Sequence, residues 1–237
     1  MRVKNFFRSS LFNDVLGITG LRPIITAFRV LFKLERDMGH FKSSARWSSV
    51  DKSGNPIPWY SYPSIEFLKT LDLRRKSVFE FGSGNSTLYF STKAKKVTSV
   101  ESSERWYLNI KEKTRRRKNV TLIYAPLKNG YTNAISSNRA RFDIIIVDGA
   151  FRKNTATIAL RKLKRDGFII LDNADWFPNT AEFLRSRGLT EVDFTGFGPI
   201  TPYRTTTSMF FSRHTIFKYL AKSHPPTPIG GIHQITD

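Results

Sequence analysis

Acidic and amide side chains stand at the ends of four short apolar runs of this chain. If these runs are strands, the side chains lie at the strands' carboxyl ends, where α/β proteins commonly place their functional residues. The residues are Glu80, Glu101, Asp148 and the pair Asp172-Asn173. Because the carboxyl ends of parallel strands meet at one edge of a sheet, we expect these side chains to lie together. Carboxylates at such an edge can accept hydrogen bonds from ribose hydroxyls or hold a hard cation such as Mg²⁺.

A glycine turn follows the first of these runs, within residues 77–90. After Glu80 come Gly82, Ser83 and Gly84, and then a segment with helical apolar spacing. The pattern predicts strand, tight turn and helix. The glycines let the backbone turn sharply and leave room for a ligand, and the start of the helix offers free N–H groups. Turns of this kind bind nucleotide-like molecules.

The second run, residues 96–101, places Glu101 where dinucleotide folds carry a ribose-binding acid, about 20 positions after the first strand. The dehydrogenase pattern needs a third glycine, but position 87 is Thr. The stretch instead resembles the first motif of class I S-adenosylmethionine-dependent methyltransferases. The matching residues are Glu80, Gly82, Gly84, Ser86-Thr87 and Glu101.

The resemblance implies a binding site for S-adenosylmethionine. It assigns Glu80 to the amino end of the donor, Gly82, Ser83 and Gly84 to close backbone approach, Ser86 to the methionine carboxylate, Glu101 and Ser102 to the ribose side, Tyr124 and Ala125 to the adenine, and Asp148 to the rim of the site. It covers roughly residues 57–213.

A second resemblance concerns Asp148, Asp172 and Asn173, which are similar to the Mg²⁺ ligands of catechol O-methyltransferases. Hard oxygen ligands suit Mg²⁺, which would orient two acceptor oxygens and lower the pKa of one. The chain departs from that family at the position of the expected catalytic lysine, which is Phe151. Asp148 is therefore assigned to catalysis, with Lys153 as the candidate base. Capping of loops by the same acids is the alternative.

The order of elements predicts an α/β protein with a doubly wound, mostly parallel seven-stranded sheet of Rossmann-like type. The remaining strands are expected at residues 119–124, 141–148, 167–173, 189–194 and 206–211. Helices are expected at 102–113 and 178–187, and a helix that contains Ile158, Leu160 and Leu163 is expected between the strands at 141–148 and 167–173. Residues 1–56 form a basic, partly helical extension and linker, 57–213 the α/β domain, and 214–237 a loosely ordered tail.

A helix is predicted from Pro23, with Ile24, Phe28, Leu31 and Phe32 on one face. We expect this face to pack on the chain's own domain; contact with a membrane surface and capping of a cleft are the alternatives. The aromatic residues Trp59, Tyr60 and Tyr62 could line a ligand or pack at a domain edge. Asp175, Trp176, Tyr203 and Arg204 are expected near the acceptor pocket.

Composition adds a strong positive charge: the net charge is +20 and the pI about 10.4. Nucleic acid, an anionic membrane surface and acidic small substrates are all compatible partners. The charge is equally compatible with a protein that binds no polyanion. There is no cysteine, and no signal peptide or transmembrane segment is predicted. We therefore expect a cytoplasmic protein, with peripheral binding to a membrane surface as an alternative. The sequence does not predict the oligomeric state.

The sequence thus predicts an S-adenosylmethionine-dependent methyltransferase that acts on an oxygen of a small-molecule or sugar-like acceptor. An aminopropyltransferase on the same fold is one alternative. That family holds its polyamine with a pair of carboxylates around the fourth strand, whereas this chain offers only Asp148 there, and its positive charge would repel a polyamine. The other is a non-catalytic, basic domain of this fold that binds RNA or an anionic surface.

Overall fold

The computed structural model describes residues 17, 20–137, 140–220, 228–229 and 231, and every structural statement below concerns these residues. The first 16 residues of the predicted N-terminal extension and most of the predicted tail beyond residue 220 lie outside them. No helix in the described part of the chain is long and apolar enough to cross a membrane.

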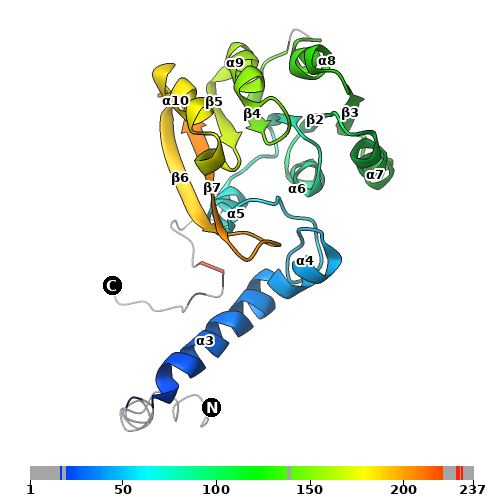
Figure 1. Ribbon diagram of the computed structural model, residues 1–237. Coiled ribbons are helices and arrows are strands. Elements are labelled where there is room, and N and C mark those ends of the chain that lie inside the picture. The colour runs from blue at the N-terminus through cyan, green and yellow to red at the C-terminus, as the bar shows by residue number, and fades with distance from the viewer. Residues whose placement is uncertain (1–16, 18–19, 138–139, 221–227, 230, 232–237) are drawn as a thin grey trace.

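A single seven-stranded sheet in the order β3-β2-β1-β4-β5-β7-β6 forms the centre of the domain (Figure 1). The first five strands are parallel, and β7 runs antiparallel to both β5 and β6. The strands are β1 (Ser77–Phe81), β2 (Lys96–Glu101), β3 (Val120–Tyr124), β4 (Phe142–Val147), β5 (Leu163–Leu171), β6 (Thr190–Phe197) and β7 (Arg204–Phe211). This confirms the predicted doubly wound, mostly parallel sheet.

Two hydrophobic cores cover the two faces of this sheet, because neighbouring residues of each central strand point to opposite sides. Ile145 of β4 packs in the core that includes α8, α9 and α10, whereas Ile144 and Ile146 pack in the core that includes α5 and α6. The helices are α5 (Tyr62–Thr70), α6 (Asn85–Lys93), α7 (Glu104–Thr114), α8 (Lys128–Asn133), α9 (Arg152–Lys162) and α10 (Pro178–Ser186), with 3₁₀ turns η2 (Ala134–Ser136) and η3 (Ala174–Trp176).

The start of β5 differs from the sequence prediction. Leu163, which we expected in the preceding helix, is the first residue of the strand and pairs with Phe142 of β4. The register shifts after this pair, and a Cβ on Gly167 would lie 2.7 Å from the carbonyl oxygen of Asp143. A glycine at a strand irregularity permits this close approach, and the apolar Leu163 is thereby buried in the sheet.

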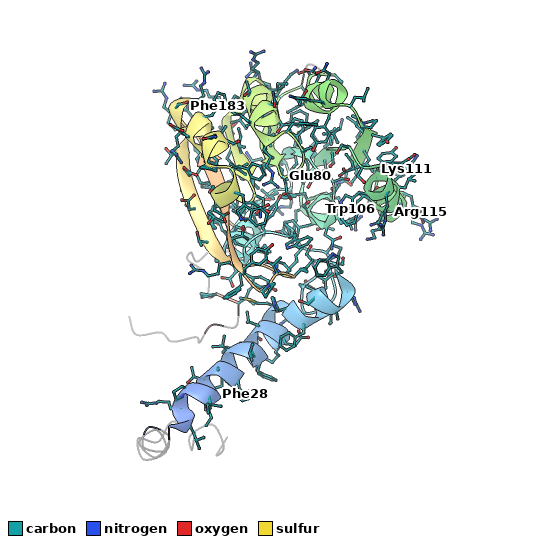
Figure 2. All side chains as sticks on the ribbon, viewed as in Figure 1. Phe28, Glu80, Trp106, Lys111, Arg115 and Phe183 are labelled. Carbon is teal, nitrogen blue, oxygen red and sulfur yellow. The ribbon has the colours of Figure 1, made fainter. Side chains whose placement is uncertain are left out.

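In the described part of the N-terminal extension, a helix projects from the domain (Figure 1). The elements there are this helix, α3 (Leu21–Lys33), the π-helical turn η1 (Leu34–Met38) and α4 (His40–Arg46). No residue of α3 is buried, and Phe28 on it is 68% exposed (Figure 2). The expectation that the apolar face of this helix packs on its own domain is therefore wrong.

The segments that flank the sheet domain on its N-terminal side (residues 48–49) and its C-terminal side (residues 214–220) both contact the domain. Asn85 at the start of α6 donates to Ser48 Oγ at 2.9 Å and to the carbonyl of Ser49 at 2.7 Å. At the other end, the backbone N–H of Asp72 donates to the carbonyl of Lys218 at 2.8 Å, and Phe217 packs in the core on the α5 and α6 side. Residues 214–220, which the sequence places in the tail, thus lie against the sheet domain.

Candidate functional site

The four acidic positions gather at the carboxyl edge of the sheet, as the strand order requires. Backbone hydrogen bonds join the strand ends: Asp148 N–H donates to Phe81 O at 3.1 Å, and Asp172 N–H donates to Val147 O at 3.3 Å. β1 pairs in parallel with β2 and β4, and β4 pairs in parallel with β5. The acidic side chains at the ends of these four strands therefore lie at one rim of the sheet.

The glycine turn after β1 has one tightly packed and one open position. Gly82 has φ 94°, and a Cβ there would lie 2.8 Å from the Cα of Gly149. Only glycine fits that left-handed, crowded position. Gly84 is extended, and the nearest atoms to a Cβ would be Ser86 Oγ at 3.6 Å and Trp106 Nε1 at 3.9 Å. The space beside Gly84 is therefore open to a ligand.

Glu101 ties this turn to the next helix. Its Oε2 accepts hydrogen bonds from the N–H of Ser83 at 2.9 Å and from the Ser83 hydroxyl at 3.2 Å. Its Oε1 accepts from the N–H groups of Ser102 and Ser103, each at 2.8 Å. All four acceptor positions of the carboxylate are used, so a ribose would share or replace some of these bonds.

Glu80 is fully buried beneath the turn, and Figure 2 shows it inside the domain. The hydroxyls of Ser86 and Thr87 donate to its two carboxylate oxygens. Burial raises the pKa of Glu80 to about 7, although both hydroxyl bonds lower it. Ser86, predicted to meet the donor's carboxylate, thus also holds Glu80 in place.

Arg152 occupies the rim between the ends of β4 and β5, and sequence reasoning did not assign it a role. Its guanidinium donates to Asp148 Oδ1 at 3.2 Å and to Asn173 Oδ1 at 3.2 Å, and also to the backbone carbonyl of Asp172. It lies over the ring of Phe177, with 4.1 Å between Cζ and the ring centroid. A planar guanidinium fork suits this set of acceptors.

The residues predicted as metal ligands do not fit a divalent cation in this arrangement. The guanidinium of Arg152 already supplies the positive charge between Asp148 and Asn173. The carboxylate of Asp172 is directed elsewhere, since its Oδ1 accepts from Thr207 Oγ1 at 2.6 Å. In the described residues, no group of three or more acidic, histidine or cysteine side chains is arranged to hold a metal. The predicted Mg²⁺ therefore gains no support.

Both rim carboxyls hold their protons more tightly than usual. Burial raises the pKa of Asp148, with Arg152 opposing the rise and Glu80 adding to it. Burial also raises the pKa of Asp172, and the charge of Asp148 adds to this rise. Perturbed carboxyl groups that share a rim are typical of functional sites. Lys153, the predicted base, lies in the exposed first turn of α9.

Tyr60 brings a phenol to the same group of acids, from the segment before α5. Its side chain is completely buried, and its Oη has no hydrogen-bond partner among the described residues. Burial raises the pKa of Tyr60, and Asp148, Glu80 and Asp172 raise it further by their charge. Buried hydroxyls are nearly always paired, so an unpaired one at a rim of acids suggests a position that a ligand or water completes. The aromatic cluster before β1 was the available signal.

The predicted adenine side lies next to Glu101. Ala125 follows β3 and donates its N–H to the carbonyl of Glu101 at 2.9 Å, and Tyr124 packs beside Tyr107 with 5.3 Å between ring centroids. An open apolar depression is lined by residues 124–130. Trp106, 44% exposed in the first turn of α7, borders the glycine turn, with its Nε1 3.9 Å from where a Cβ on Gly84 would lie, and was not predicted.

The late loops add aromatic side chains near the rim. The rings of Trp176 and Tyr203 lie 6.2 Å apart, and both are about half exposed. Asp175 accepts hydrogen bonds from Thr205 Oγ1 at 3.3 Å and Thr206 N–H at 3.0 Å, which ties η3 to β7. The structure thus brings Asp175, Trp176 and Tyr203 close together, and their place in an acceptor pocket, with Arg204, stays a prediction.

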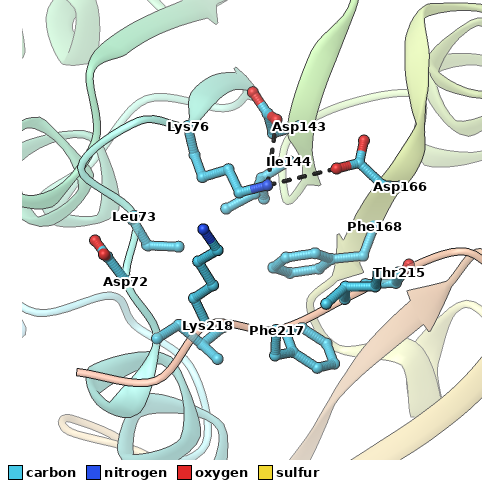
Figure 3. A pocket seen from close by; sticks show the side chains of 12 residues that line it. Asp72, Leu73, Lys76, Asp143, Ile144, Asp166, Phe168, Thr215, Phe217 and Lys218 are labelled. Atoms are coloured by element: carbon cyan, nitrogen blue, oxygen red, sulfur yellow. Dashed lines mark ion pairs between the residues drawn. The ribbon is translucent and has the colours of Figure 1, made fainter. Parts of the chain in front are cut away.

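A separate hollow lies at the opposite, amino edge of the sheet (Figure 3). There Lys76 Nζ lies 3.5 Å from Asp143 and 3.7 Å from Asp166. Lys164 adds a bond of 2.8 Å to Asp143. The carboxylates of Asp143 and Asp166 are thus already paired with lysines. We therefore place the functional site at the carboxyl edge of the sheet.

Comparison with known proteins supports the fold. No protein-family model and no curated protein sequence matches the chain. An O-methyltransferase from Bacillus cereus, solved with SAH, is 16% identical with a TM-score of 0.51, over 58% of this chain and 74% of that one. The O-methyltransferase TomG from Streptomyces achromogenes, solved with SAM, is 13% identical with a TM-score of 0.52, over 61% and 74%.

At this level of identity, the likeness concerns architecture. The chain has the Rossmann-like fold of class I methyltransferases, as the glycine-turn motif predicted.

Proposed function

We propose that this protein is an S-adenosylmethionine-dependent methyltransferase that acts on an oxygen of a small-molecule or sugar-like acceptor. The observation that carries the proposal is the glycine turn at the carboxyl edge, with Glu80 buried beneath it, Glu101 bonded to it and open space beside Gly84. Structures of this fold solved with SAH and SAM are consistent with it.

The residues present suit this donor in chemical type. A carboxylate such as Glu80 can hold the ammonium group, and Glu101 can accept from ribose hydroxyls. Tyr124 and Ala125, with the depression beside them, offer an apolar wall for the adenine. Bound there, the donor would supply an electrophilic methyl group on a sulfonium.

Asp148 is the group we assign to proton removal from the acceptor hydroxyl. Its carboxyl has a raised pKa, and its side chain is 23% exposed at the rim. A base is most effective when its pKa lies near the working pH. Arg152 holds this carboxylate through a hydrogen bond of 3.2 Å and is the positioning residue. Lys153 remains the alternative base predicted from the sequence.

The acceptor site operates without a divalent cation in this proposal. The guanidinium of Arg152 stands among the groups that would otherwise ligate one, and it balances the charge of Asp148. Trp176 and Tyr203, both about half exposed, supply aromatic walls for an acceptor, and the buried phenol of Tyr60 lies beside the rim carboxyls.

Calorimetric titration of the full chain with S-adenosylhomocysteine tests the donor site. We expect micromolar binding by the natural protein and markedly weaker binding by Gly84→Ala, because a Cβ at this position would enter the space beside the turn while its nearest protein atom, Ser86 Oγ, lies at an ordinary contact distance of 3.6 Å. The melting temperature of the variant should stay close to that of the natural protein. Absence of binding at neutral and mildly basic pH would refute the proposal and favour the non-catalytic alternative.

A further inference from the structure

The helix α3 carries a broad apolar face that the domain does not cover. Phe28 is 68% exposed, Phe32 61% and Ile24 52%, and Leu21 and Leu31 are nearly half exposed. Figure 2 shows Phe28 on the part of α3 that projects away from the sheet domain. Leaving aromatic and aliphatic side chains in water on one face is unfavourable, so a surface of this kind indicates a binding partner.

The basic residues of α3 lie along a separate stripe. Arg22, Arg29 and Lys33 are spaced seven and four residues apart and so share one side of the helix. There is no acidic residue in α3 itself. The first acids follow in η1, where Glu35 accepts from the N–H of Phe41 at 2.7 Å and Asp37 pairs with Arg36 at 2.9 Å and with Lys33 at 3.8 Å.

These features match a bilayer interface better than a second copy of the helix. In a two-helix seam built on Leu21, Ile24, Phe28 and Leu31, the flanking positions within α3 would be Ile25 and Phe32 on one side and Ala27 on the other. Such positions usually carry charged residues, whereas here they extend the apolar face. A wide apolar face with phenylalanines and a stripe of Arg and Lys is typical of helices that lie in the membrane interface.

We propose that α3 lies in the plane of an anionic lipid surface, with Phe28 and Phe32 in the acyl region and its basic stripe at the headgroups. At 13 residues the helix is too short to span a bilayer, which needs about 20. The net charge of +20 on the whole protein adds attraction to the same surface. The projecting position of α3 leaves the sheet domain beside the membrane (Figure 1).

Vesicle flotation of the full chain tests this proposal with a matched pair of variants. Phe28→Glu and Thr26→Glu each add one negative charge to α3, but only the first removes a side chain from the apolar face. We expect binding to vesicles of phosphatidylcholine with phosphatidylserine, weaker binding to phosphatidylcholine alone, and partition about tenfold weaker for Phe28→Glu than for Thr26→Glu. Unchanged melting temperatures would show that both variants fold.

Three outcomes would overturn the proposal. Equal binding by the two variants would mean that charge alone drives association. A dimer in light scattering that Phe28→Glu dissociates, without vesicle binding, would assign the face to a second copy. Tight, salt-dependent binding of RNA that both variants retain, in the absence of flotation, would assign the charge to nucleic acid.

Discussion

The carboxylate of Glu101 accepts two hydrogen bonds from Ser83, from its N–H at 2.9 Å and its hydroxyl at 3.2 Å. The end of β2 thereby fixes the conformation of the turn that follows β1. Two segments distant in sequence act as one unit, and a change at Glu101 alters the turn as well as any ribose contact.

Glu101→Gln should weaken binding of S-adenosylhomocysteine about a hundredfold. The amide keeps the shape of the side chain but replaces one acceptor oxygen with a donor, which opposes the N–H groups that now bond to it. Calorimetry measures the effect, with Glu104→Gln in the exposed first turn of α7 as the control. Equal affinities for the two variants would contradict the role of Glu101.

Donor affinity should depend on pH through Glu80. Its ionised form is the partner of the donor's ammonium group, and its pKa is about 7. Affinity should therefore fall roughly tenfold for each pH unit below about 7 and level off above it. Glu80→Gln should bind weakly with a flat profile, which separates this titration from that of Asp148. An unchanged slope in the variant would assign the titration to another group.

The raised pKa of Glu80 also makes the stability of the folded protein depend on pH. Because the folded chain binds the proton of Glu80 more tightly than the unfolded chain, the free energy of unfolding should decrease as the pH rises from 4.5 through about 7. Urea denaturation across this range measures it, and Glu80→Gln should reduce the decrease.

The sequence predicted the sheet well because its signals are local. The buried run of β4 and the acid at the end of β2 can be identified from a few adjacent residues, and both strands lie where expected. The role of Arg152 could not be predicted in this way. It depends on where the first turn of α9 places a long side chain relative to Asn173, and this is set by the packing of two βα units.

The N-terminal extension shows that a local sequence pattern can predict a helix without predicting what the helix packs against. The spacing of Ile24, Phe28 and Phe32 predicts an amphipathic helix, and α3 is one. The spacing does not say what covers its apolar face, because a domain surface and a membrane select similar patterns.

Chelation should leave methyl transfer unchanged. Arg152 supplies the positive charge at the rim, so EDTA removes nothing that Asp148 requires. Arg152→Met should reduce turnover about a hundredfold, because Asp148 loses its hydrogen bond and its pKa rises further. Assays of transfer to acceptors with hydroxyl groups, followed as a pH profile, measure both. Loss of activity in the natural protein upon EDTA treatment would contradict the cation-free site.

Asp143→Asn should lower stability without affecting the functional site. Burial raises the pKa of this carboxyl, but bonds with Lys164 and with the N–H and hydroxyl of Ser77 lower it more, to below its usual value. We expect a loss of about 2 kcal/mol at neutral pH, and a smaller loss in acid, where the carboxylate becomes protonated. Donor affinity should be unchanged, since Asp143 lies at the opposite edge of the sheet (Figure 3).

Tyr60→Phe should separate function from stability most clearly. The hydroxyl of Tyr60 is buried without a partner among the described residues, so its removal should leave the free energy of unfolding unchanged or raise it by about 1 kcal/mol. If this phenol meets the acceptor, turnover should fall about tenfold or more while donor affinity stays the same. Urea denaturation, calorimetry and turnover measured on the same preparation decide the matter. A variant that is less stable by more than about 1 kcal/mol would show that the hydroxyl has a structural partner, and would remove Tyr60 from the site.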